Sequence, residues 1–263
     1  MMKDITIGQY IPGKTPVHNL DPRIKIIITF IFITILFLVK NFLGYVYVLG
    51  FMALAVLLSQ ISVKYLFKGL KPLIFIILLT VFLNMFMVEG KVIYTIWKLK
   101  ITEEGLIQAA FMGLRLIFLI TGASLLTLTT SPIALTDGIE KLLNPLKKIG
   151  VPAHELAMMM TIALRFIPTL LEETDKIMKA QMARGADFET GGLMARAKAM
   201  VPILVPLFIS AFRRADELAL AMEARCYRGG ESRTRMKQLR LENRDVIAML
   251  VTFGFCALII WSR

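Results

Sequence analysis

The chain is poor in the side chains from which metal and redox sites are built. Its 263 residues include two cysteines, Cys226 and Cys256, and two histidines. The cysteines are far apart and differently flanked, and His18 has no second histidine or cysteine near it. Metal cages and disulfide frameworks need several such residues at short, regular spacings. We therefore expect no metal site, no disulfide framework and no redox chemistry.

Acidic residues are also scarce. There are 19 of them against 31 Lys and Arg, so the formal net charge is +12, yet 57% of the residues are hydrophobic and the mean hydropathy is +0.69. Soluble domains are about 45–50% apolar. Basic nucleic-acid binders are polar, and disordered chains hold fewer apolar residues. We expect the charge to face a membrane surface or an acidic protein partner, and no nucleic acid.

One string resembles a nucleotide site, but its surroundings argue against that function. Residues 8–15 match the phosphate-loop pattern G-x-x-x-x-G-K-[ST] letter for letter, beginning at Gly8. Such a loop needs a helix that starts at its Lys-Thr pair, so that backbone N–H groups bind phosphate. Pro16 removes an N–H directly after Thr15, and no apolar strand ending in Asp follows to hold Mg²⁺. We expect no nucleotide or other cofactor here.

Long apolar runs indicate a membrane protein. A transmembrane helix needs about 17–25 mainly apolar residues. Five segments meet this requirement, at 24–39, 42–58, 72–88, 106–129 and 246–261. We therefore predict an all-α polytopic membrane protein with about five transmembrane helices. Its predicted parts are an N-terminal membrane region with four helices at 1–130, a cytoplasmic region of long helices at 131–245 and a C-terminal transmembrane helix at 246–263.

The region at 131–245 differs in composition from the flanking spans. It holds 18 of the 31 Lys and Arg residues, and its two apolar runs, 156–171 and 200–212, are interrupted by prolines. Both runs are poor membrane spans, and we expect them to form buried faces of long helices. If one run were a transmembrane span, the C-terminus would lie on the opposite side of the membrane. If both runs were spans, the C-terminus would return to its original side. The candidate hinges in these runs are Pro168, Pro202 and Pro206.

Charge asymmetry predicts the orientation. Cytoplasmic loops carry an excess of Lys and Arg. With the N-terminus inside, the basic N-terminal segment, Lys64, Lys68, Lys71 and the region at 131–245 all lie inside. The sequence thus predicts a cytoplasmic N-terminus and an external C-terminus.

Two polar features near the spans have structural interpretations. In the string at 18–25, Asp21 is a good N-cap, Pro22 suits the first helical position, and Arg23 and Lys25 would anchor the helix at the inner leaflet. Arg115 lies inside a span and is therefore a functional candidate. We favour a structural role for it, in which helix carbonyls or a polar group such as Asn84 satisfy the guanidinium.

A near-repeat in the basic region is the most informative feature. Residues 175–185 align with 216–226 at an offset of 41, and each copy follows a proline-interrupted apolar run and ends in Ala-Arg and a small residue. Gly185 suits a left-handed helix cap. Each arginine would be exposed and could insert into a pocket of a partner protein. Two copies of the motif therefore predict two similar pockets, or sockets, on the partner. The competing interpretation is that Arg184 and Arg225 complement the helix dipoles.

These motifs together resemble a known family. The string His-x-Leu-Asp-Pro-Arg-x-Lys at 18–25 and the paired Ala-Arg-small motifs, over almost the whole chain, are similar to the CbiQ-like family of transmembrane coupling components of energy-coupling factor (ECF) transporters, the EcfT proteins. The second motif departs from the family pattern at Cys226, where Gly is expected, which puts a left-handed cap there in doubt. The motif residues are Ala183, Arg184 and Gly185, and Ala224, Arg225 and Cys226.

The resemblance implies a subunit of an ABC-type importer in a prokaryotic cell membrane. Members join two cytoplasmic ABC-type ATPases to a membrane substrate-binding subunit, the S component, for ATP-driven uptake of vitamins or metal ions. The arginine of each motif is implied to end a coupling helix and to dock in one ATPase. The subunit itself is implied to be non-catalytic, and the S component to choose the substrate.

Two other classes remain as alternatives. A membrane-embedded transferase or protease would carry a signature such as His-Glu-x-x-His or Gly-x-Ser-x-Gly, and neither occurs. A stand-alone secondary carrier usually has inverted repeats with broken helices near the bilayer midplane. Here both copies of the repeat run in the same direction within the basic region. Co-purification of ATPase subunits would discriminate among these classes.

Overall fold

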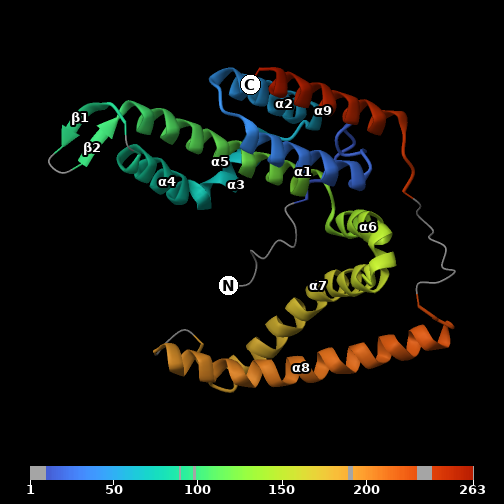
Figure 1. Cartoon of the computed structure of the whole chain (residues 1–263). Helices are drawn as coiled ribbons and strands as arrows, with labels where there is room; N and C mark the ends of the chain where they lie inside the picture. The colour runs from blue at the N-terminus through green and yellow to red at the C-terminus, as the bar shows by residue number, and fades with distance from the viewer. Residues whose placement is uncertain (1–9, 89, 97–98, 189–191, 230–238, 263) are drawn as a thin grey trace. The chain divides into compact units, whose positions relative to one another are not determined.

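The computed structural model describes residues 10–88, 90–96, 99–188, 192–229 and 239–262, which are mostly helical (Figure 1). This confirms the all-α polytopic class, with one short hairpin of strands in addition. The elements are α1 (Pro22–Leu38), α2 (Phe42–Ser59), α3 (Val63–Leu70), η1 (Lys71–Leu73), α4 (Ile74–Met87), β1 (Val92–Ile96), β2 (Leu99–Thr102), α5 (Glu103–Thr129), α6 (Pro132–Leu143), η2 (Asn144–Ile149), α7 (Ala153–Ala183), α8 (Leu193–Ala224) and α9 (Asn243–Trp261).

The described chain divides into two compact units. The first, which we call the membrane unit, comprises residues 10–88, 90–96, 99–139 and 239–262. The second, the α7–α8 unit, comprises residues 140–188 and 192–229. Each unit has its own internal packing and is described separately below.

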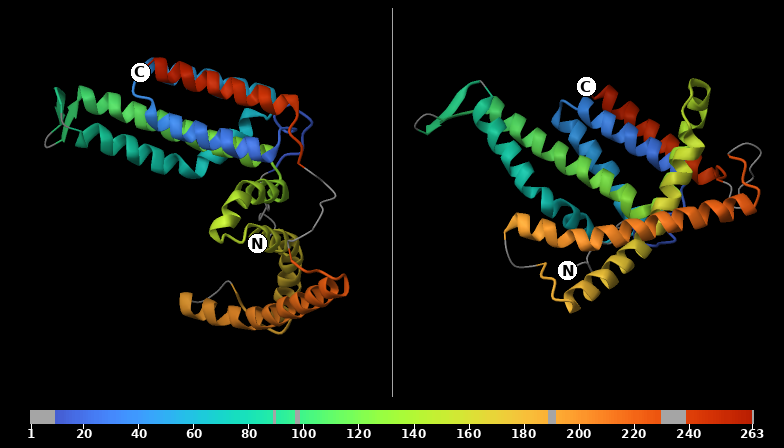
Figure 2. Two further views of the ribbon diagram at one scale, coloured as in Figure 1. Left: turned by 45° about the vertical axis from the view of Figure 1, so that its right-hand side comes forward. Right: turned by 90° about the horizontal axis from the view of Figure 1, so that it is seen from below.

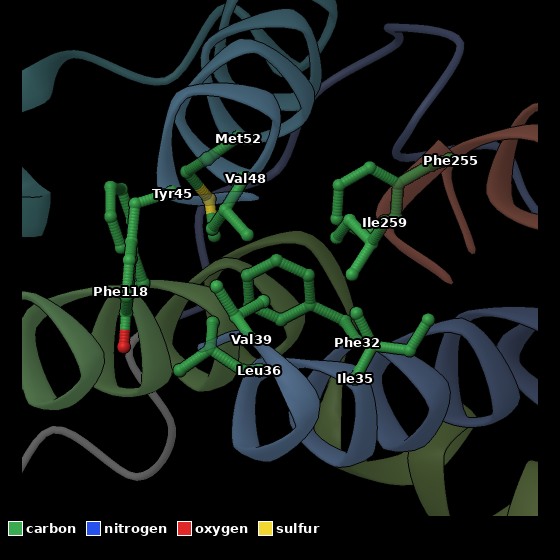
Figure 3. Packing of buried hydrophobic residues seen from close by; sticks show 10 residues of the cluster. All are labelled: Phe32, Ile35, Leu36, Val39, Tyr45, Val48, Met52, Phe118, Phe255 and Ile259. Carbon is green, nitrogen blue, oxygen red and sulfur yellow. The ribbon is translucent and has the colours of Figure 1, made fainter. Parts of the chain in front are cut away.

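Apolar side chains from α1, α2, α5 and α9 converge in the core of the membrane unit (Figure 3). Phe32 of α1 stacks on Phe51 of α2 with ring centroids 5.8 Å apart, and Phe51 stacks on Phe255 of α9 at 4.3 Å. A Cβ at Gly122 of α5 would lie 2.8 Å from Cε1 of Phe32, so α5 needs glycine where it meets α1. The core thus joins segments that lie far apart in the sequence.

Five helical stretches in the described residues are long and apolar enough to cross a membrane: α2, Val63–Met87, α5, α7 and α9. Their number is the predicted one, and four overlap predicted spans. The fifth differs. α7 is long and apolar enough to cross a membrane although its apolar run was expected in the cytoplasmic region. α1, which contains the predicted span at 24–39, has 17 residues, is shorter than each of the five and is not among them.

In the α7–α8 unit the two long helices cross one another (Figure 2). Nη2 of Arg214 in α8 lies 3.1 Å from Oε2 of Glu173 in α7 at this crossing. Ile203 is a buried apolar residue of α8, and Leu207 and Ser210 follow it at helical spacing on the same face. A single stripe of α8 therefore packs on α7.

Candidate docking site

The first Ala-Arg-Gly motif forms the C-terminal cap of α7. The helix ends at Ala183, and Gly185 follows with φ +90°. The Gly185 N–H donates to Met182 O and the Ala186 N–H donates to Gln181 O, each at 3.0 Å. This pair of bonds defines a Schellman motif, in which the left-handed residue lets the chain turn back over the last carbonyls. The sequence prediction of a left-handed cap at Gly185 is confirmed.

The second motif forms the same cap on α8, although it lacks glycine. Cys226 adopts φ +56°, its N–H donates to Glu223 O at 2.8 Å, and the Tyr227 N–H donates to Met222 O at 3.0 Å. The doubt about a left-handed conformation at Cys226 was therefore wrong. A non-glycine residue there costs about 1 kcal/mol, and the two cap hydrogen bonds offset this cost.

Both motif arginines occupy the same position relative to their caps. Arg184 has φ −89° and ψ 4°, and Arg225 has φ −92° and ψ 15°. All six motif residues are exposed. Within the described part of the chain neither guanidinium forms an ion pair with a carboxylate. Each cap thus presents an unpaired cation in one fixed backbone geometry.

The two caps lie at equal distances from the point where α7 and α8 cross. Arg184 lies eleven residues beyond Glu173 on α7, and Arg225 lies eleven residues beyond Arg214 on α8. At about 1.5 Å per residue, each arginine stands about 16 Å along its helix from the crossing ion pair. We call the stretch 173–184 of α7 the first arm and the stretch 214–225 of α8 the second arm. The offset of 41 in the sequence repeat thus corresponds to two arms of equal length, each of which ends in an arginine.

The prolines predicted as hinges lie in the same two helices, on the N-terminal side of the crossing ion pair. Pro168 is within α7, and Pro202 and Pro206 are within α8. A proline cannot donate the helical hydrogen bond to the residue four positions earlier, so each removes one bond from its helix. Hinge motion at these positions stays a prediction.

α8 also carries an exposed apolar face. The face lies about 200° around the helix from the buried stripe that begins at Ile203. An exposed stripe of this size marks an interaction surface rather than ordinary solvent-facing helix. Its side chains are Met200, Val201, Leu204, Val205, Phe208, Ile209 and Phe212.

A hydrogen-bonded chain beside the second cap was missed by the sequence analysis. The His154 ring in α7 has Nδ1 3.2 Å from Oε1 of Glu140 in α6, and Nε2 3.4 Å from the Tyr227 hydroxyl. Tyr227 directly follows the motif of α8. These three residues are separated by up to 87 positions, and their types alone give no signal that they meet.

The string at 18–25 forms a polar cluster at one end of the membrane unit. Asp21 is the N-cap of α1, as predicted, and its Oδ1 accepts from the Arg23 N–H at 2.9 Å. The Asp21 N–H donates at 2.8 Å to Asp245, whose other carboxylate oxygen accepts from the Glu242 N–H at the start of α9. The string therefore ties α1 to α9.

The Lys25 side chain is buried in the membrane unit, which corrects the expected anchoring role. It is only 6% exposed, and its Nζ donates to His18 O at 3.0 Å, to Thr129 O at 2.9 Å and to Thr130 Oγ1 at 3.3 Å. The last carbonyl of α5 belongs to Thr129, so the ammonium caps that helix. The short string pattern did not reveal this because two of the three acceptors, on Thr129 and Thr130, lie more than a hundred residues away.

Two ionisable groups in the cluster titrate away from their usual ranges. Burial raises the pKa of Asp21, but the hydrogen bonds and charge of Arg23 outweigh it and hold the pKa below its ordinary value. Burial lowers the pKa of His18, the Ile11 carbonyl opposes this shift, and the charge of Lys25 lowers the pKa further. The cluster is thus arranged for a charged carboxylate and a neutral imidazole.

The nearby phosphate-loop match has no helix in the required place. Gly8 and Gln9 lie outside the described residues. Thr15 is followed by turn residues, and the next helix begins at Pro22. The geometry that would aim helix N–H groups at a phosphate is therefore not formed at Lys14 and Thr15.

Arg115 makes one carbonyl contact of the kind that we favoured from the sequence, while its buried Nε has no hydrogen-bond partner among the described residues. Its Nη2 donates to Val39 O, at the C-terminal end of α1, at 3.3 Å, and its guanidinium lies 5.5 Å from the centroid of the Phe37 ring. Asn84 instead donates to Thr80 within its own helix. Arg115 thus binds a helix-end carbonyl, which is the favourable position for a cation.

Comparison with known proteins covers almost the full chain. The family described as CbiQ, cobalt transport protein, matches residues 13–236. The energy-coupling factor transporter transmembrane protein EcfT of Thermosediminibacter oceani is 65% identical over 251 residues, which are 95% of each chain. The proteins of the same description from Clostridium kluyveri and Bacillus subtilis are 63% and 52% identical. These two matches cover all of this chain and 98% and 100% of the relatives.

Proposed function

The chain belongs to the CbiQ family and is a transmembrane component of an energy-coupling factor transporter, and we propose that it couples two cytoplasmic ABC-type ATPase subunits to a membrane substrate-binding S component. The complex would import vitamins or related micronutrients. As a membrane subunit of a transporter the chain is not an enzyme, and we assign ATP hydrolysis to the partner ATPases.

The observation that carries this proposal is the pair of matched caps on α7 and α8. Each presents one exposed arginine, without an ion-pair partner in the described part of the chain, at the same distance along its helix from the crossing. A partner with two similar subunits offers two similar sockets, and acidic side chains in them would form charge-assisted bonds with the guanidinium groups. A dipole role alone does not account for the equal arm lengths.

The apolar face of α8 supports contact with the S component. Phe208 is 60% exposed and Phe212 is 68% exposed, and they lie on the side of α8 away from α7. An S component is a hydrophobic membrane protein, so it offers the apolar surface that this face requires. Flexing at Pro168, Pro202 and Pro206 would transmit closure of the ATPases to this contact.

We further propose that the protein lies in the bacterial cell membrane with a cytoplasmic N-terminus. This orientation places the basic α7–α8 unit on the cytoplasmic side, in accord with the distribution of Lys and Arg. α7 is long and apolar enough to span, but its last third carries charged residues that favour an aqueous position for that end. These residues are Glu172, Glu173, Asp175, Lys176 and Lys179.

The test compares motif arginines with other exposed arginines on the same helices. Arg184→Ala and Arg225→Ala are each expected to lower ATPase co-purification in detergent and substrate uptake in cells. Loss of a desolvated arginine contact costs roughly 2–5 kcal/mol. Arg165→Ala on α7 and Arg213→Ala on α8 are the matched controls, since both side chains are exposed and lie outside the motifs.

Wild-type ATPase binding by both motif variants would contradict the docking proposal. Uptake by the chain in the absence of any ATPase would favour a stand-alone carrier instead.

Cys226 offers a second readout, because it is an exposed thiol within the docking motif whereas Cys256 is partly buried. Maleimide labelling of Cys226 in a Cys256→Ala chain should slow when the ATPases are bound.

A further inference from the structure

The membrane unit contains an apolar cavity of about 380 Å³. Its walls come from α1, α2, α5 and α9, with the segment Pro16–Leu20 at one end. The stacked rings of Phe51 and Phe255 bring α2 and α9 together, and Phe32 and Phe51 line the far end of the cavity. The cavity belongs to the membrane unit, whereas the docking caps belong to the α7–α8 unit.

Each of the four helices contributes about two turns to the cavity. The contributing stretches are 25–32 of α1, 51–58 of α2, 122–129 of α5 and 244–252 of α9. At about 1.5 Å per residue these stretches are about 10–12 Å long. They all lie at the end of the unit that holds the N-terminus of α1, so the cavity reaches about a third of the way across a hydrocarbon core of ~30 Å.

The walls give water little to bind. The ammonium of Lys25 borders the space, but it donates to three protein oxygens. The hydroxyls of Thr29, Thr129 and Thr252 each donate to a carbonyl four residues earlier in their own helices. Ordered water needs two to four polar partners, and an apolar cavity without them stays dry. The occupant expected here is therefore hydrocarbon.

The exposed helical side chains of the lining belong to α2 and α9. Leu54 and Leu58 of α2 are each 45% exposed, and Ile247 and Val251 of α9 are 60% and 44% exposed. The helical lining residues from α1 and α5 are buried or half-buried and form the inner wall. Because α2 and α9 are both candidate membrane spans, the mouth between them opens onto lipid chains.

A cation stands at the polar end of this mouth. Arg244 lines the cavity in the first turn of α9, and its side chain is 40% exposed. Its Nη2 pairs with Oε2 of Glu242 at 2.6 Å, and its Nε is buried with no hydrogen-bond partner among the described residues, so the exposed N–H groups of the guanidinium are the ones open to a ligand. Arginine N–H groups bind phosphate oxygens well. A phosphate here would sit where a headgroup meets the hydrocarbon boundary.

We propose that the cavity binds one acyl chain of a membrane phospholipid, which enters between α2 and α9 with its phosphate beside Arg244. The lipid would fill the space between the four helices and support their packing. The proposal depends on the membrane location of the chain and not on ATPase docking, so the two can fail separately.

The first test needs no substitution. The full-length chain is reconstituted in vesicles of phosphatidylglycerol and phosphatidylethanolamine that contain a phospholipid with a photoreactive acyl chain, and the labelled residues are mapped by mass spectrometry. Labelling is expected at the inner wall, at Thr29 and Leu125, as well as on the exposed face of α4 at Phe75 and Leu78. Labelling confined to exposed faces such as that of α4 would overturn the proposal.

The second test fills the cavity. Ala55 and Ala248 line it from facing helices, whereas Ala53 and Ala257 lie on the same helices, are exposed and do not line it. Native mass spectrometry of the purified chain titrated with phosphatidylglycerol should show at least tenfold less bound lipid in Ala55→Phe and Ala248→Phe. The controls Ala53→Phe and Ala257→Phe should retain about one lipid, as in the wild type. Equal binding by the filled and control variants would overturn the proposal.

The third test separates the headgroup from the chain. Arg244→Gln should weaken phosphatidylglycerol binding roughly tenfold, the loss expected for one charge-assisted contact, and leave binding of a fatty alcohol unchanged.

If the S component, added to the complex, crosslinks to Thr29 and Leu125 and excludes the photoreactive lipid, the cavity is a protein-binding site and the lipid proposal is wrong.

Discussion

At the residue scale, the caps of α7 and α8 differ at the single position that needs a positive φ. Gly185 has φ +90° and Cys226 has φ +56°. We expect Gly185→Ala to destabilise the end of α7 by about 1 kcal/mol and Cys226→Gly to stabilise the end of α8 by a similar amount. Hydrogen exchange of the amides of Gly185, Ala186 and Tyr227 in the cap bonds measures both effects.

A matched control lies close to the first cap. Gly192 has φ −73°, and a Cβ placed on it has open space around it. Gly192→Ala is therefore expected to leave exchange at the α7 cap unchanged. Slower exchange in Gly185→Ala, or faster exchange in Cys226→Gly, would contradict the assigned cap geometry.

His18 gives a prediction about pH. Its Nε2 lies 3.1 Å from Ile11 O, which only accepts, so Nε2 carries the proton and Nδ1 accepts from the Thr15 hydroxyl at 2.6 Å. Because its pKa is lowered from 6.5, the folded chain binds the second proton more weakly than the unfolded chain does. Stability should be fully present above pH 6.5 and decline as the pH falls through and below that value.

The measurement is the Tm in detergent between pH 7.5 and pH 5. The wild type should lose stability toward pH 5, and His18→Gln should lose less over the same interval because it lacks the titrating group. His154→Gln removes the other histidine and should keep the part of the slope that belongs to His18. Identical slopes for the wild type and His18→Gln would contradict the prediction.

At the element scale, apolar runs predicted the spans because a bilayer imposes a length and a composition on each helix. The predicted segments at 42–58 and 106–129 became α2 and α5 with ends shifted by three residues or fewer. The hairpin of β1 and β2 was not foreseen, because its sequence is too short and too mixed to show a strand period. The burial of Lys25 was missed because it depends on α5 packing beside α1.

That burial makes Lys25 a contact between elements. Its ammonium joins α1 to the end of α5 and to the turn before α1. Lys25→Met keeps much of the side-chain volume but leaves buried oxygens without a donor, so we expect a loss of roughly 1–3 kcal/mol of stability. Thermal unfolding in detergent should show a lower Tm. Lys14→Met, at an exposed position, should change the Tm little, and equal Tm values would contradict the assigned role.

At the scale of the whole molecule, the repeat has a geometric meaning that sequence alone did not supply. The sequence predicted two anchors for two sockets from residues 175–185 and 216–226. It did not predict that Glu173 and Arg214, also 41 residues apart, meet where the helices cross. Since both arms extend eleven residues beyond this pair, the separation of the anchors is fixed by arm length and crossing angle. Two tethered contacts also raise each other's effective concentration.

Arm length can be changed without altering the anchor. Seven helix-forming residues inserted after Leu218 would lengthen the second arm by about 10 Å and rotate Arg225 by only about 20°. We expect ATPase co-purification to fall to the level of Arg225→Ala, because the intact cap no longer reaches its socket. Combining the insertion with Arg225→Ala should cause no further loss. Full ATPase retention by the inserted chain would show that docking does not depend on arm length.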